Sequence, residues 1–194
     1  YENVPSYIPG DTIKKVNGKT MTLIEFFVHS PFKDSLVKGR AESDKNVTSI
    51  VMQARFKKSS WDTKPSALYL FGGDADHYIW EEIQNQSSAH NNGEKLDFDI
   101  FLAPHHCSWT YFNDVPYKKG ETDEPVESSK KLIKDHKVSG AVIIASSKQI
   151  NDDDDNPPHY PAKKEYVKLI GSSDKFVSLA EEPDSKNSKP VVYV

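Results

Sequence analysis

Two short apolar runs that each end in metal-ligating side chains constrain this chain most. Residues 68–71 are followed by Gly-Gly-Asp74, and residues 98–103 are followed by Pro-His105-His106. Such runs, bounded by Gly or Pro, are typical of buried strands. Carboxylate and imidazole groups at the ends of two neighbouring strands can meet at one sheet edge, where they suit zinc or manganese. The sequence therefore predicts an α/β protein with a metal site around these three side chains.

Composition narrows the class of protein. The 194 residues suit one domain. Lys and Arg number 25 against 29 Asp and Glu, so the chain lacks the overall basic charge of a general nucleic-acid binder, although a local basic groove stays open. The single Cys107 excludes an internal disulfide and favours a reducing compartment. No apolar run approaches the roughly 18 residues of a membrane span.

The remaining pattern predicts strands first and then strands alternating with helices. Asn17-Gly18 predicts a type I′ turn in a hairpin, and Asp76 is placed to cap a helix. The later alternation predicts helices layered on a sheet. Strands are expected over 11–16, 19–28, 46–56, 67–71, 98–103, 140–144, 176–179 and 191–194, and helices over 77–83, 127–137 and 163–170.

Four motifs, taken in order, carry a resemblance to a known family. They are Asn46-x-x-Ser49-Ile-Val, Leu-Phe-Gly-Gly-Asp74-Ala, Phe-Leu-Ala-Pro-His105-His106-Cys-Ser108 and Asn156-Pro-Pro-His159-Tyr-Pro. The chain resembles the metallo-β-lactamase fold hydrolases, and most closely the branch that contains the ComEC DNA-uptake proteins. In that branch the motifs run N-x-x-S-L-V, L-L-T-G-D-A, L-K-V-P-H-H-G-S and N-x-Y-G-H-P. The resemblance covers roughly residues 10–180.

The resemblance implies an αββα sandwich with two divalent metal ions, zinc or manganese, that activate water for hydrolysis. Substrates in such proteins are commonly phosphodiesters, including nucleic acids. By motif match Asp74 would bridge both metals, and one of His105 and His106 would be a terminal ligand of the second metal. His159 would contact the substrate or donate a proton. The branch also suggests a cytoplasmic, bacterial protein.

One family signature is missing. The motif H-x-H-x-D-H, which supplies most of the metal ligands, does not occur in the chain. The resemblance therefore implies that residues 1–194 are the C-terminal portion of one metallo-β-lactamase-like domain. The N-terminal half, or a parent protein that carries it, would be the partner that completes the site. The start at Tyr1 rather than Met fits an excised piece, and Cys107 stands where the family has Gly.

Each candidate residue also has a purely structural explanation. Asp74 suits a turn after Gly-Gly, and His105 and His106 suit a surface position after a strand. Adjacent histidines on an extended segment point to opposite sides, so at most one is expected to ligate metal while the other orients it or meets the substrate. His159 alone would be an ordinary loop histidine, and only the order of the motifs supports a functional role for it.

Two functions therefore remain open. The first is a metal-dependent hydrolase, and the second is a metal-free interaction or regulatory module that keeps the fold without catalysis. The order of the four motifs favours the first, and the missing ligands support the second. The aromatic residues Trp109, Tyr111 and Phe112 either stack on bases or pack in the core.

Overall fold

A mixed β-sheet forms the framework of the chain. The computed structural model describes residues 6–33, 45–114, 123–153, 156–187 and 189–192. Neighbouring strands are antiparallel from β1 to β6 and parallel from β6 to β9. The sheet order is β1 (Thr12–Ile13), β4 (Ile24–Ser30), β5 (Val51–Phe56), β6 (Ala67–Phe71), β7 (Phe98–Leu102), β8 (Lys137–Ala145) and β9 (Phe176–Ser178).

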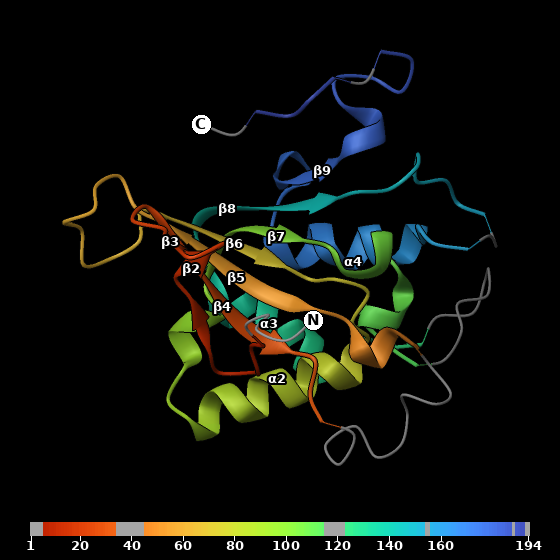
Figure 1. Cartoon of the computed structure of the whole chain (residues 1–194). Coiled ribbons are helices and arrows are strands. Elements are labelled where there is room, and N and C mark those ends of the chain that lie inside the picture. Colours follow the sequence, from red (N-terminus) through yellow and green to blue (C-terminus); the bar gives the residue numbers. More distant parts are fainter. Residues whose placement is uncertain (1–5, 34–44, 115–122, 154–155, 188, 193–194) are drawn as a thin grey trace.

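Helices connect the parallel strands and lie on one face of the sheet (Figure 1). Helix α2 (His77–Ala89) joins β6 to β7, α3 (Glu127–His136) joins β7 to β8, and α4 (Tyr160–Ile170) joins β8 to β9. Right-handed crossovers that advance in one direction along a sheet place every helix on the same side. The predicted α/β class and the predicted layer of helices are confirmed. None of the described helices is long and apolar enough to cross a bilayer.

The main core lies between the sheet and the helices. Leu70, Phe101 and Ile143, from three neighbouring strands, are fully buried there. Trp80 of α2 meets Phe101 edge-on, with ring centroids 5.4 Å apart. Edge-to-face aromatic pairs of this kind add to the free energy of burial. Helix and sheet are therefore held by apolar packing that fixes the position of the strand ends.

The aromatic segment after β7 belongs to this core. Trp109, Tyr111 and Phe112 are all buried. The Tyr111 ring stacks on Tyr166 with centroids 5.5 Å apart, and its hydroxyl donates to the Ser129 carbonyl at 3.0 Å. These three rings therefore pack in the core and cannot stack on bases. Residues 115–122 of the same predicted loop lie outside the described residues.

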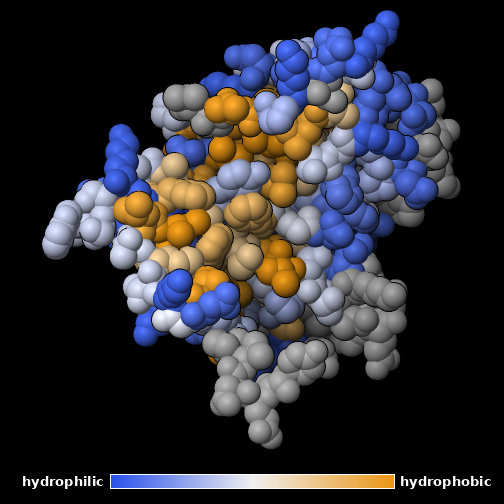
Figure 2. All heavy atoms as spheres, turned by 45° about the horizontal axis from the view of Figure 1, so that its top comes forward, coloured by the Kyte–Doolittle hydropathy of each residue, from blue (hydrophilic) through white to orange (hydrophobic). Residues whose placement is uncertain are grey.

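The other face of the sheet is also apolar, and no helix covers it in the described part of the chain. Figure 2 looks obliquely onto this face and shows hydrophobic side chains across its middle. We call it the open sheet face. By register it comprises Ile24, Phe26, Met52, Ala54, Phe56, Tyr69, Phe71, Ile100, Leu102, Val142, Ile144 and Val177.

The predicted hairpin turn is confirmed. Strands β2 (Lys15–Val16) and β3 (Lys19–Thr20) pair around Asn17-Gly18, whose φ angles are 50° and 75°. The strand expected over 19–28 is interrupted, because β3 ends at Thr20 and β4 begins at Ile24. Strand β4 then pairs with β1 and β5 in the large sheet.

Several predicted boundaries are wrong. The strand expected over 46–56 begins only at Val51, because residues 45–48 form a 3-10 turn. Helix α2 continues past residue 83 to Ala89, and α4 begins at Tyr160 instead of residue 163. Val191 and Val192 are not in a strand, and residues 193–194 of that predicted strand lie outside the described residues. Each error falls where polar residues or proline interrupt the regular spacing of apolar residues.

The buried His29 predicts a specific pH dependence of stability. Its side chain is 4% exposed, and Nε2 donates to the Lys95 carbonyl at 2.9 Å. Burial lowers the pKa of His29 from 6.5 to about 4. The unfolded chain therefore binds a proton first as the pH falls, which favours unfolding. We expect this residue to lower the free energy of unfolding by up to about 3 kcal/mol between about pH 6.5 and about pH 4, with no effect above that window.

Urea unfolding of the parent and of His29→Gln across this pH range checks the expectation. Gln keeps a side-chain donor for the Lys95 carbonyl but does not titrate. The free energy of unfolding of the parent, relative to that of His29→Gln, should fall as the pH falls below about 6.5. A difference that stays constant from neutral pH to about pH 4 would show that His29 is not held neutral by burial.

Candidate functional site

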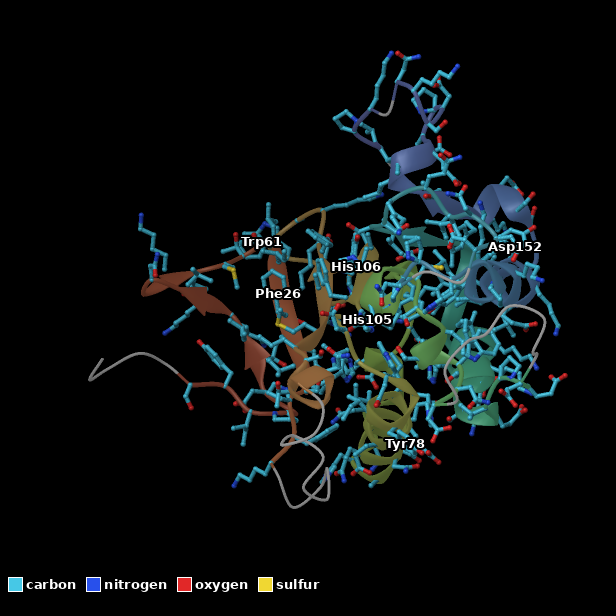
Figure 3. All side chains as sticks on the ribbon, turned by 90° about the vertical axis from the view of Figure 1, so that its right-hand side faces the viewer. Phe26, Trp61, Tyr78, His105, His106 and Asp152 are labelled. Atoms are coloured by element: carbon cyan, nitrogen blue, oxygen red, sulfur yellow. The ribbon has the colours of Figure 1, made fainter. Side chains whose placement is uncertain are left out.

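The four sequence motifs meet at one edge of the sheet. The carboxyl ends of the parallel strands β6, β7 and β8 lie at this edge, and Figure 3 looks onto it with His105 and His106 near the centre. The His105 amide donates to the Gly73 carbonyl at 2.9 Å, which joins the loops after β6 and β7. The His159 amide donates to the Cys107 carbonyl at 3.0 Å, which adds the start of α4. We call residues 49–50, 72–74, 103–108, 146 and 159 the rim.

Two glycines allow the loops of the rim to touch. A Cβ at Gly72 would lie 2.6 Å from the Leu102 carbonyl oxygen, which is too close for any side chain. Gly73 has φ +54°, and a Cβ there would lie 2.7 Å from the Ile50 carbonyl oxygen. Only glycine tolerates both a left-handed backbone and so close an approach. The Gly-Gly pair therefore holds the ends of β5, β6 and β7 against one another.

A serine fixes the strand end that carries the first motif. Ser30 Oγ donates to the Ser49 carbonyl at 2.6 Å and accepts from the Val51 amide at 3.1 Å. The side chain replaces the backbone pairing that is lost at the shift between β4 and β5. Ser49 thus stands beside Gly73 because of a buried hydroxyl on the neighbouring strand.

The two histidines occupy a strained turn. His105, His106 and Cys107 have φ angles of 48°, 56° and 70°, so three successive residues with side chains are left-handed. Each costs roughly 1–3 kcal/mol, and such residues cluster at functional sites. The expectation that the two histidines lie on an extended segment is wrong. Glycine would relieve the strain at position 107. The Cys107 thiol is buried, and burial raises its pKa, so it stays protonated and unreactive.

The proton on the His106 ring is on the nitrogen that leaves the other one able to bind a metal. Its Nδ1 lies 2.7 Å from the Ser146 carbonyl oxygen. A carbonyl only accepts, so Nδ1 carries the proton and Nε2 keeps a lone pair. The ring is exposed at the rim. Histidines that bind metal almost always donate their other ring nitrogen to a carbonyl or carboxylate in this way.

His105 is oriented less firmly. Its Nδ1 lies 3.4 Å from Thr110 Oγ1, and that hydroxyl lies 3.0 Å from Ser108 Oγ. Each of these two hydroxyls can donate to the other, so the contact leaves both tautomers of His105 open. The ring is also held by a longer contact than that of His106.

His159 has the opposite tautomer. Its Nδ1 accepts from the Trp109 amide at 2.9 Å, so in the neutral ring the proton sits on Nε2. Nε2 would have to lose this proton before it could ligate a metal, so the geometry does not match a metal ligand. The role of His159 as a substrate contact or proton donor stays a prediction.

The two tautomers give a direct test of the rim geometry. Long-range proton–nitrogen NMR spectra at about pH 8 should show His106 protonated at Nδ1 and His159 protonated at Nε2. Single His106→Gln and His159→Gln variants assign the signals. Equal tautomers in the two rings would mean that at least one of the Ser146 and Trp109 contacts does not form in solution.

The two aspartates of the second motif have different roles. Asp76 Oδ1 accepts from the Ile79 amide at 3.0 Å and caps α2, as predicted. Asp74 is half-buried in the loop before the helix and does not cap it. No cluster of three or more His, Cys, Asp or Glu side chains that suits a metal occurs within the described ranges. Asp74 and one histidine are too few ligands for a metal site.

Sequence analysis missed Ser146. Its carbonyl fixes the His106 ring, and the residue directly follows the last residue of β8. The sequence does contain a signal for Ser146, because it follows an apolar strand directly, and Asp74 and His105 also follow apolar strands of the same sheet within a few residues.

Comparisons of the chain with protein-family models, with curated proteins and with solved structures find no match.

Proposed function

We propose that the rim is part of a metal-dependent hydrolase site of the metallo-β-lactamase kind, acting on phosphodiester or nucleic-acid substrates. The observation that supports it most is the convergence of four motifs, distant in sequence, at one sheet edge. Backbone hydrogen bonds join the second, third and fourth motifs, and Ser49 and Ile50 of the first motif pack against Gly73. A strained turn presents the histidines there, and strain of this kind is retained where function requires it.

Each rim residue has a distinct role in this proposal. Two divalent ions, Zn²⁺ or Mn²⁺, would polarise the scissile group and lower the pKa of water toward neutrality. Asp74 would bridge the ions, and His106 would hold one of them through Nε2 while the Ser146 carbonyl orients the ring. His105 stands beside the same position. His159 Nε2–H would donate to the substrate or to the leaving group.

The proposal requires ligands from outside the described residues. If the resemblance holds, they would come from the N-terminal half of an αββα sandwich, or from a parent protein that carries it. We call the complex of this chain with that segment the assembled protein. The isolated chain of 194 residues is expected to be inactive.

Hydrolysis of bis(p-nitrophenyl) phosphate by the assembled protein tests the proposal. Activity should vanish with EDTA and return with Zn²⁺ or Mn²⁺. His159→Gln should lower kcat by about 100-fold, the usual size of a lost proton donor. His90→Gln is the matched control, because His90 is exposed at the end of α2, away from the rim. Activity that resists EDTA, or equal effects of the two substitutions, would refute the assigned roles.

The alternative is a metal-free interaction or regulatory module with the same fold. One observation favours it, namely that the described residues contain no complete metal-binding cluster. This alternative predicts that even the assembled protein holds no metal and hydrolyses nothing. The NMR tautomers would be the same in both cases, so metal content decides between them.

A further inference from the structure

A cavity between β4 and α2 lies outside the candidate site. It has a volume of about 590 Å³, and its walls come from β4, from the second half of α2 and from residues 7–10 and 31–33. No residue of the rim lines it. Small-molecule sites usually have volumes of about 300–1,000 Å³. The cavity is therefore large enough for a small organic ligand.

Most walls of this cavity are apolar. Phe27, Phe32 and Ile83 line it and are buried. Tyr7 and Ile8 also line it but are 39% and 56% exposed, so the cavity opens to solvent beside them. Aromatic rings bind other rings edge-on or in offset stacks. The walls therefore suit a ligand with an aromatic body.

One buried imidazole in the wall has a nitrogen without a partner. His29 lines the cavity and is 4% exposed. Its Nε2 donates to the carbonyl of Lys95, a residue that does not line the cavity. Burial lowers the pKa of His29 to about 4, so at neutral pH the ring is neutral and Nδ1 keeps a lone pair. No described residue donates a hydrogen bond to this Nδ1, which leaves it for a ligand.

A second buried polar group lines the same cavity from the helix. Ser87 of α2 is 5% exposed, and its hydroxyl makes no hydrogen bond to any described residue. Buried polar side chains in folded proteins are almost always hydrogen-bonded. His29 and Ser87 come from different elements, and both turn to one cavity with a hydrogen-bonding group to spare. A bound ligand would supply the two missing hydrogen bonds.

We propose that the cavity between β4 and α2 binds a neutral aromatic molecule that carries a hydroxyl group. A hydroxyl suits both polar groups, since it can donate to His29 Nδ1 and accept from Ser87 Oγ. A carboxylate is disfavoured, because it has no proton to donate and would face the lone pair of Nδ1. A cation is disfavoured by Lys33, which is exposed in the wall. The inference does not depend on the proposed hydrolase function.

Titration of the 194-residue chain with 2-naphthol, followed in proton–nitrogen correlation NMR spectra, tests the proposal. The matched ligand is 2-methoxynaphthalene, which has the same ring system but no hydroxyl proton. 2-Naphthol should bind at least about ten-fold more tightly, because only it can satisfy Nδ1 of His29. It should shift the backbone amides of Phe27, His29 and Ser87. Equal affinities, tighter binding of 2-naphthoate, shifts confined to other residues or no shifts at all would overturn the proposal.

A pair of neighbouring substitutions gives an independent measurement. Ser87→Ala removes the hydroxyl in the wall and should weaken the binding of 2-naphthol by about three-fold or more. The affinity for 2-methoxynaphthalene should change less. Ser88→Ala is the matched control, because Ser88 is exposed and does not line the cavity. Alanine favours helices, so both variants should keep α2. If the two variants bind 2-naphthol equally well, Ser87 does not contact the ligand and the proposed site is wrong.

Discussion

Asp74→Asn should abolish most of the hydrolysis by the assembled protein, with a loss of at least about 100-fold in kcat. Asn matches Asp in shape but lacks the negative charge that would bridge two cations, and removal of an anionic ligand weakens metal binding strongly. Asp74 is half-buried and does not cap α2, so the fold should be unaffected. The measurement is steady-state kinetics with metal content determined on the same sample.

Asp76→Asn provides the matched control two residues away. Asp76 caps α2, and Asn caps helices about as well, so activity and stability should both be retained. If Asp74→Asn keeps full activity, Asp74 is a turn residue and the assignment of the site is wrong. Equal losses in both variants would point to a general disturbance of the loop rather than to a lost ligand.

Trp80→Ala should lower the free energy of unfolding by about 3–5 kcal/mol. Trp80 has no exposed surface, and its ring lies edge-on to Phe101 and Tyr111, at centroid distances of 5.4 and 5.9 Å. The substitution removes a large apolar side chain and leaves a cavity between α2 and the sheet, which cannot collapse because the strands are paired on both sides. Urea unfolding measures the loss.

Trp61→Ala is the control for this second prediction. Trp61 is 90% exposed in the loop between β5 and β6, so its removal should change stability by no more than about 0.5 kcal/mol. A small effect of Trp80→Ala would mean that α2 is not firmly packed on the sheet. The position of the β6–α2 loop, and with it Asp74, would then lack the support that the structure assigns to it.

The strands at the centre of the sheet are predictable from local sequence. The runs at 67–71 and 98–103 are apolar, short and bounded by Gly or Pro, and they form β6 and β7 almost as predicted. The Asp76 cap is equally local. The start of β5 is not, because the β-branched residues at 47–48 favour a strand while the chain forms a 3-10 turn there. A bond from Ser30 on another strand decides that boundary.

The geometry of the candidate site depends on contacts that no local pattern reveals. A left-handed turn at His105 and His106 is not predictable from local sequence, because histidine, although enriched at left-handed positions, adopts them only in a small minority of cases. The turn forms because the Gly73 carbonyl and the Ser146 carbonyl each bind one of the two histidines. The motifs therefore predict which residues meet, and only the structure gives the tautomers that distinguish a candidate ligand from a candidate proton donor.

The open sheet face shows a further limit of prediction from the sequence. A continuous apolar strand indicates burial on both faces, and the sequence contains that signal at 140–144. It does not say which element covers each face. Helices α2, α3 and α4 follow from the period of the sequence, and no described helix lies on the face opposite them.

Metal analysis by plasma mass spectrometry tests the central claim most directly. The samples are the assembled protein and the isolated chain, purified without chelator and dialysed together. The proposed site predicts about two equivalents of zinc or manganese in the assembled protein and almost none in the isolated chain. An assembled protein without metal would contradict the claim and leave the metal-free interaction module as the function of this fold.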